Sequence, residues 1–169
     1  MNKLKRYRVA HKGLKEGSHS FRFVLDRDFF DCFKATEGRE GELAADVEIV
    51  KHGSFIEVKM RLEGLVKATC DRCLDEMELP LSGEMKVLLK QGDQEAGNED
   101  DFIVLPPGED YIDLGPLLYE MFMLHYPLRV VHPDGGCAPE MESVLGEFVI
   151  NEKVASDPRW DELKRLINN

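Results

Sequence analysis

Apolar and polar residues alternate almost strictly along residues 43–49, 56–70 and 77–89. This period-two pattern is typical of strands that bury one face. It predicts three long antiparallel strands in a meander, with Gly64 marking a bulge or bend. Strands this long must twist and coil. The pattern therefore predicts an α+β fold: a strongly curved, mainly antiparallel sheet of about five to seven strands, with a partial barrel as its extreme form, and a few helices.

Two proline-marked segments indicate helices. In "DLGPLLYEMFMLHYPL", Asp113 is a candidate N-cap and Pro127 ends the helix, which confines it to about residues 114–125. The tail "SDPRWDELKRLI" has Asp157 as a candidate N-cap and predicts a short C-terminal helix. We expect one domain over residues 1–137, a linker over 138–155 and a helical tail over 156–169.

The formal net charge of −11 is unevenly distributed. Residues 1–15 hold six basic side chains and no acid, so residues 16–169 carry −17. Such a body repels phosphate backbones and attracts basic proteins. The expected partner-binding residues are exposed acids and one aromatic side chain: Glu42, Asp46, Glu48, Glu57, Asp100, Asp101 and Trp160. Direct RNA contact through residues 3–15, with Tyr7 for stacking, is the alternative.

The chain shows no secretory h-region at its N-terminus and no apolar run of membrane-spanning length, so we expect a cytoplasmic protein without a membrane partner. In that compartment a close cysteine pair more often binds metal or does redox work than forms a disulfide. No nucleophile elbow, phosphate-binding glycine loop or His-Glu-x-x-His motif occurs, so the sequence predicts no catalytic residue.

The stretch "TCDRCLDEM" places Cys70 and Cys73 between two predicted strands. A C-x2-C turn supplies two of the four ligands of a structural zinc. Cys137 is the expected third ligand and His132 the fourth, with His125 and Glu140 as weaker candidates. A redox pair is less favoured, because a thioredoxin-type pair begins a helix, whereas this pair lies between two predicted strands. Cysteines that only pack the hairpin end are a further alternative. A zinc enzyme is disfavoured, since the His-x-Glu partner of deaminases is missing.

Three segments, "CDRCLDEMELPL", "DLGPLLYEMFMLHYPLRVVH" and "DPRWDELKRL", together resemble the YceD family, the large ribosomal RNA subunit accumulation protein family. The resemblance runs from about residue 20 to the end. It implies a non-enzymatic ribosome-assembly factor that supports accumulation or processing of large-subunit (23S) ribosomal RNA. It also implies a basic large-subunit ribosomal protein or a pre-ribosomal particle as partner.

The resemblance places the family's first cysteine pair on Cys70 and Cys73. Many relatives have a second pair after the long helix. Here Cys137 matches its first member, but Glu140 stands at the second position. The resemblance therefore does not supply a four-sulfur site, and it leaves His132 or Glu140 to complete a zinc site, or no site.

Overall fold

Three long strands follow one another along the chain as the sequence predicts. The computed structural model describes residues 3–35, 37, 40–92, 102–133 and 135–148. Its elements are η1 (Lys3–Tyr7), β1 (Arg8–Ala10), β2 (Gly17–Leu25), α1 (Arg27–Cys32), β3 (Gly41–Lys51), β4 (Ile56–Thr69), β5 (Glu76–Gln91), β6 (Phe102–Leu105), β7 (Tyr111–Asp113), α2 (Leu114–His125) and α3 (Pro139–Phe148).

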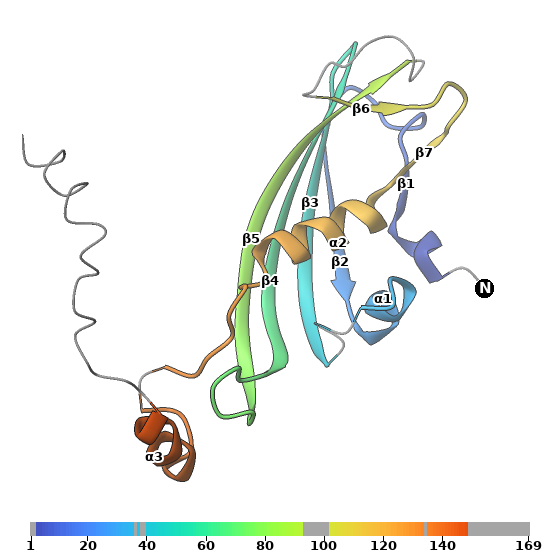
Figure 1. Ribbon diagram of the computed structural model, residues 1–169. Coiled ribbons are helices and arrows are strands. Elements are labelled where there is room, and N and C mark those ends of the chain that lie inside the picture. The colour runs from blue at the N-terminus through green and yellow to red at the C-terminus, as the bar shows by residue number, and fades with distance from the viewer. Residues whose placement is uncertain (1–2, 36, 38–39, 93–101, 134, 149–169) are drawn as a thin grey trace, which may run out of the picture.

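Five strands form the main sheet in the order β2-β3-β4-β5-β6 (Figure 1). Neighbouring strands from β2 to β5 are antiparallel, which confirms the meander, while β6 lies parallel to β5. Strands β1 and β7 form a separate antiparallel pair. The fold is therefore α+β, as predicted. Gly64 pairs with Leu43 and Leu81 in an unbroken register, so the predicted bulge is wrong.

The sheet is open, with β2 and β6 at its edges, so the prediction of a strongly curved sheet or partial barrel is wrong. A barrel closes only when its edge strands pair with each other. Here the four-residue β6 pairs with the end of β5 alone. Helix α2 covers one face of the sheet instead (Figure 1). The apolar side chains of that face thus pack on a helix and do not need strands wrapped around them.

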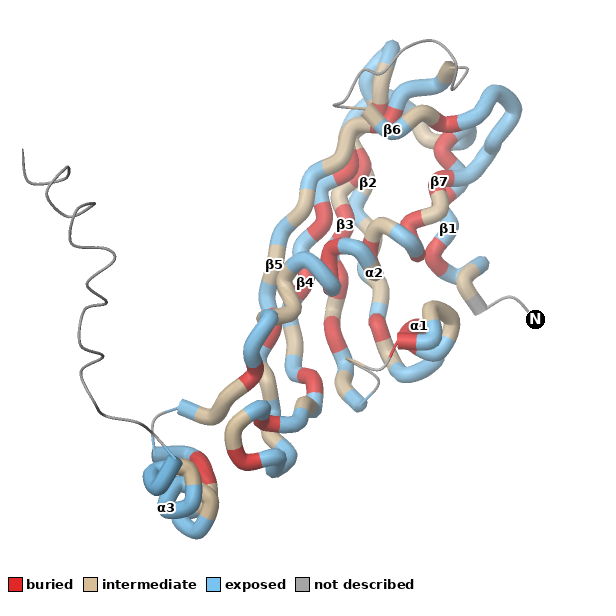
Figure 2. The backbone as a smooth tube through the Cα atoms, viewed as in Figure 1, coloured by how far each residue is buried: buried red, intermediate tan, exposed pale blue. Residues whose placement is uncertain are grey.

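The core lies between that face of the sheet and the helices (Figure 2). Leu43 and Val58 are fully buried on the strands, and Phe122 is fully buried on α2. The ring of Phe122 lies 4.8 Å from that of Phe30 on α1, so both helices share one core. Helix α2 has the predicted bounds, and the Asp113 side chain accepts a hydrogen bond from the Gly115 N–H at 3.2 Å.

Helix α3 occupies the first part of the segment predicted as a linker. The predicted C-terminal helix over 156–169 lies outside the described residues. No helix in the described part of the chain has both the length and the apolar content needed to cross a membrane.

Candidate metal centre

The turn between β4 and β5 holds the first two cysteines. The Cys70 N–H donates to the Asp75 carbonyl at 2.9 Å, and the Leu74 N–H donates to the Cys70 carbonyl at the same distance. Leu74 has φ 65°, the left-handed conformation that turns the chain back into β5. This tight turn brings Cys70 and Cys73 together, and their exposed fractions are 0% and 4%.

The segment after α2 delivers the other two candidate ligands. Two hydrogen bonds between Asp71 and Val130, which we call the Asp71 clasp, join this segment to the β4–β5 turn. The Asp71 N–H donates to the Val130 carbonyl, and the Val130 N–H donates to the Asp71 carboxylate, both at 2.7 Å. The clasp lies one residue from Cys70 and two residues from His132. It therefore fixes the two loops against each other beside the candidate ligands.

The end of α2, just before this segment, lies close against β5. A Cβ atom added to Gly83 would lie 2.3 Å from the His125 ring, so only glycine leaves space for that ring. His125 Nδ1 is hydrogen-bonded to the Met121 carbonyl at 2.8 Å. His125, a weaker ligand candidate in the sequence, thus packs the end of α2 onto the sheet and lies outside the metal cluster.

Cys70, Cys73, His132 and Cys137 form one cluster, whose ligand atoms all lie within 4.8 Å of one another. The Cys70 and Cys137 sulfurs are 4.0 Å apart. His132 Nδ1 lies 3.4 Å from the Cys73 sulfur and 3.8 Å from the Cys137 sulfur. These are the four residues that the sequence singled out.

The spacing of the cluster matches a tetrahedral zinc site. Zinc bonds of about 2.3 Å to sulfur and about 2.0 Å to nitrogen put two sulfurs about 3.8 Å apart. The same geometry puts a sulfur and a nitrogen about 3.5 Å apart. The three separations given above lie close to these values, and the remaining pairs of ligand atoms lie within 4.8 Å. All four cysteines of the chain are free, so no disulfide competes for these sulfurs.

The pKa values of Cys70 and Cys137 are shifted in opposite directions. Burial raises the pKa of Cys70, but backbone N–H groups of Cys73, His132 and Arg72 outweigh it and lower that pKa to about 6. Burial and the neighbouring sulfurs raise the pKa of Cys137 to about 11. The backbone N–H groups around Cys70 therefore favour its thiolate form, the form that binds a cation, whereas Cys137 would release a proton on binding one.

Glu140, the other weak ligand candidate, lies on α3, is exposed and does not belong to the cluster. His132 therefore occupies the fourth position. Sequence reasoning missed the Asp71 clasp and the contact of His125 with Gly83. Asp71 was recognisable only as one of several acids in the turn, because its partner is 59 residues away.

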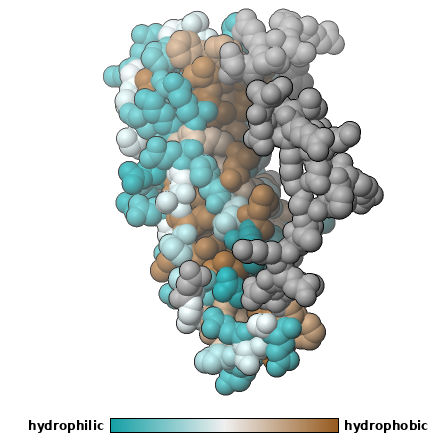
Figure 3. Space-filling view, turned by 60° about the vertical axis from the view of Figure 1, so that its left-hand side comes forward, coloured by the Kyte–Doolittle hydropathy of each residue, from teal (hydrophilic) through white to brown (hydrophobic). Residues whose placement is uncertain are grey.

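The predicted acidic face carries both signs of charge. Asp46 forms an ion pair with Arg22 at 3.6 Å. Glu57 forms one with Lys86 at 2.7 Å, and that hydrogen bond contributes most to lowering the Glu57 pKa. Glu48 pairs with Lys59 and Glu42 is exposed. The view toward the β5 side shows hydrophilic residues with hydrophobic ones between them (Figure 3). Asp100, Asp101 and Trp160 lie outside the described residues.

The basic N-terminal segment is largely engaged with the body. Tyr7 is 1% exposed and its hydroxyl donates to the Val24 carbonyl at 2.7 Å, so the prediction that it stacks on RNA bases is wrong. Arg6 pairs with Asp26, Arg8 with Asp113 and Lys12 with Asp110. These pairs neutralise half of the six basic side chains that the RNA hypothesis used.

A family model matches residues 58–167, which is more than half of the chain and includes all four residues of the metal cluster. No curated protein and no solved structure matches the chain. The matched family is described as "Large ribosomal RNA subunit accumulation protein YceD". The chain, with its open, mainly antiparallel sheet and its Cys3His cluster, therefore belongs to the YceD family.

Proposed function

We propose that this chain is a non-enzymatic assembly factor that supports accumulation of large-subunit (23S) ribosomal RNA in the cytoplasm. It acts by binding a basic large-subunit ribosomal protein or a pre-ribosomal particle. The observation that carries this proposal is the match to a family described by accumulation of that RNA. The net charge of −11 supports a basic partner, because opposite charge steers association.

The cluster supports a structural zinc as part of the same proposal. Three sulfurs and one imidazole nitrogen are a donor set that zinc prefers, and four protein ligands complete its tetrahedron. A catalytic zinc keeps a position open for water. Cys70, Cys73 and Cys137 are at most 5% exposed, which fits a closed site. Bound zinc would tie the β4–β5 turn to the segment after α2.

The test is the ribosomal RNA of cells that lack the protein. We expect the ratio of large-subunit to small-subunit ribosomal RNA to fall and to recover when the full chain is restored. Affinity purification of the restored chain, at low and at high salt, then identifies the partner. We expect basic ribosomal proteins at low salt and fewer of them at high salt. A normal ratio in the deleted cells would overturn the proposed function.

A further inference from the structure

Helix α3 has an apolar face that the rest of the described chain leaves largely uncovered. Met141, Val144, Leu145 and Phe148 are spaced as one stripe of a helix. Met141 packs against the cysteine cluster. Farther along the stripe, Val144 is 48% exposed and Phe148 is 76% exposed. No residue of α3 is buried, so within the described part of the chain this helix has a largely exposed apolar face.

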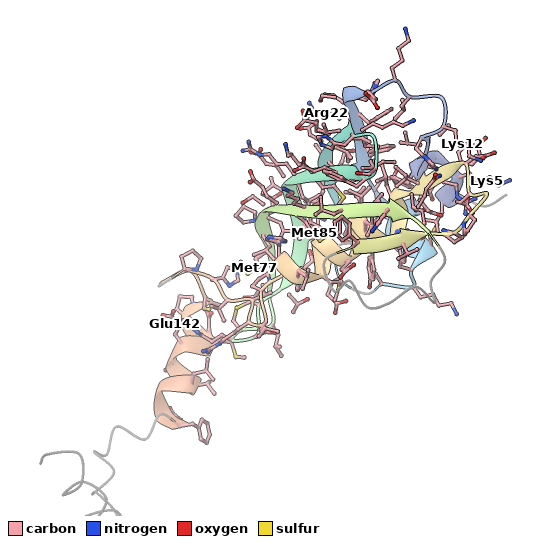
Figure 4. The ribbon with its side chains drawn as sticks, turned by 90° about the horizontal axis from the view of Figure 1, so that it is seen from above. Lys5, Lys12, Arg22, Met77, Met85 and Glu142 are labelled. Carbon is pink, nitrogen blue, oxygen red and sulfur yellow. The ribbon has the colours of Figure 1, made fainter. Side chains whose placement is uncertain are left out.

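The same helix is strongly acidic. Glu140, Glu142 and Glu147 are exposed, and the helix contains no lysine or arginine. None of the three forms an ion pair with another described residue, unlike Asp46 and Glu57 on the sheet. Glu142 lies at the end of the molecule where Met77 packs on the cysteine cluster, away from Lys5 and Lys12 (Figure 4). A charged partner would not have to break ion pairs to reach these glutamates.

Charge decides between the partners that such a face could bind. A second copy would bring three more glutamates against the first three, which like-charge repulsion disfavours. Residues 156–169 contain three acids and three bases, so the tail of this chain adds no net electrostatic attraction to the three glutamates. A basic segment with apolar side chains complements both the stripe and the glutamates.

We propose that the apolar face of α3 docks a basic, amphipathic segment of the partner protein. This inference rests on the proposed function and places the contact at the metal end of the molecule, whereas the sequence predicted it at acids of the sheet such as Asp46 and Glu57. Cys137 lies two residues before the first residue of α3, Pro139, and Met141 packs on the cysteine cluster. The metal centre therefore holds the start of the docking helix in place.

The test measures binding of a fluorescent, helix-forming peptide of leucine and lysine to the full chain by anisotropy. In V144S/F148S we expect affinity to fall about tenfold or more, because buried apolar anchors dominate such contacts. The matched control V24S/L65S removes side chains that are 44% and 49% exposed on the sheet, and we expect no change. A second pair of variants tests the contribution of the negative charges. E142Q/E147Q should weaken peptide binding more than the control E42Q/E78Q, which neutralises two exposed glutamates on the sheet.

All four double variants change exposed residues, so unaltered thermal unfolding should accompany them. Equal weakening by V144S/F148S and V24S/L65S would overturn the inference, as would no binding of the peptide. Tighter peptide binding in W160S would identify the chain's own tail as the occupant, and a dimer lost in V144S/F148S would identify a second copy. Either result would also overturn it. The proposed function is judged separately, by the ribosomal RNA ratio.

Discussion

Removing the Asp71 clasp should weaken zinc binding without removing a ligand. In Asp71→Ala the Val130 N–H loses its carboxylate acceptor at 2.7 Å, while the reverse backbone bond can remain. A hydrogen bond to a charged group is worth about 1.5–3 kcal/mol. Asp71 is exposed, so we take the lower end, about 1.5 kcal/mol, which corresponds to about tenfold in the zinc dissociation constant. Loss of an outer-shell partner typically costs about 10–100-fold in metal affinity.

The assay is competition for zinc between the full chain and a chromogenic chelator at neutral pH. Asp75→Ala is the matched control, because it removes one exposed carboxylate from the same turn. Asp75 accepts the hydrogen bond from Cys70 through its backbone carbonyl, so Asp75→Ala keeps that bond. We expect Asp71→Ala to weaken zinc binding about tenfold and Asp75→Ala to weaken it by less than about threefold. Equal weakening would show that negative charge, and not the clasp, supports the site, and this reasoning would then be refuted.

Three further predictions concern the cluster and the core. Cys70→Ser should lower the metal content of the purified protein from one zinc per chain to none, as measured by elemental analysis; retained zinc would contradict the Cys3His site. His132→Ala should abolish tight zinc binding in the same measurement, whereas Glu140→Gln should leave it unchanged; the opposite order would place Glu140 at the fourth position. Tyr7→Phe should lower the free energy of unfolding by about 1 kcal/mol through its lost hydrogen bond, as measured in urea. Burial raises the Tyr7 pKa to about 12, so the unfolded chain loses this proton first as pH rises. The tyrosine's stabilisation is therefore complete below pH 10 and declines toward pH 12, and Tyr7→Phe should flatten that decline.

Local patterns were sufficient for most elements of the fold. The alternation along residues 43–89 predicted the meander, because a strand with one buried face must place every second side chain in the core. Asp113 and Pro127 predicted both ends of α2, since capping and proline act within one turn of the helix. The cysteine spacing, with His132, identified the cluster because a hairpin turn places Cys70 and Cys73 together.

Long-range contacts were beyond this reasoning. Whether the sheet closes depends on what packs against its face, and α2 follows the last strand in sequence. Asp46 was predicted as a free partner-binding acid, because the sequence does not show that Arg22, on the neighbouring strand, lies beside it. Tyr7 looked available for RNA because its neighbours in sequence are basic, although the space it fills is formed by Phe23 and Phe29.

The sequence by itself determined the three long strands of the meander, where α2 begins and ends, and the short set of cysteine, histidine and glutamate side chains from which a metal site could be built. Those properties follow from periodicity, capping and donor chemistry, which act between near neighbours. Only the tertiary structure decided that the sheet stays open, that Asp71 joins the two ligand loops, and that the apolar stripe of α3 is not covered by the other described residues. These outcomes depend on contacts between segments that are distant in sequence, and packing in three dimensions sets such contacts.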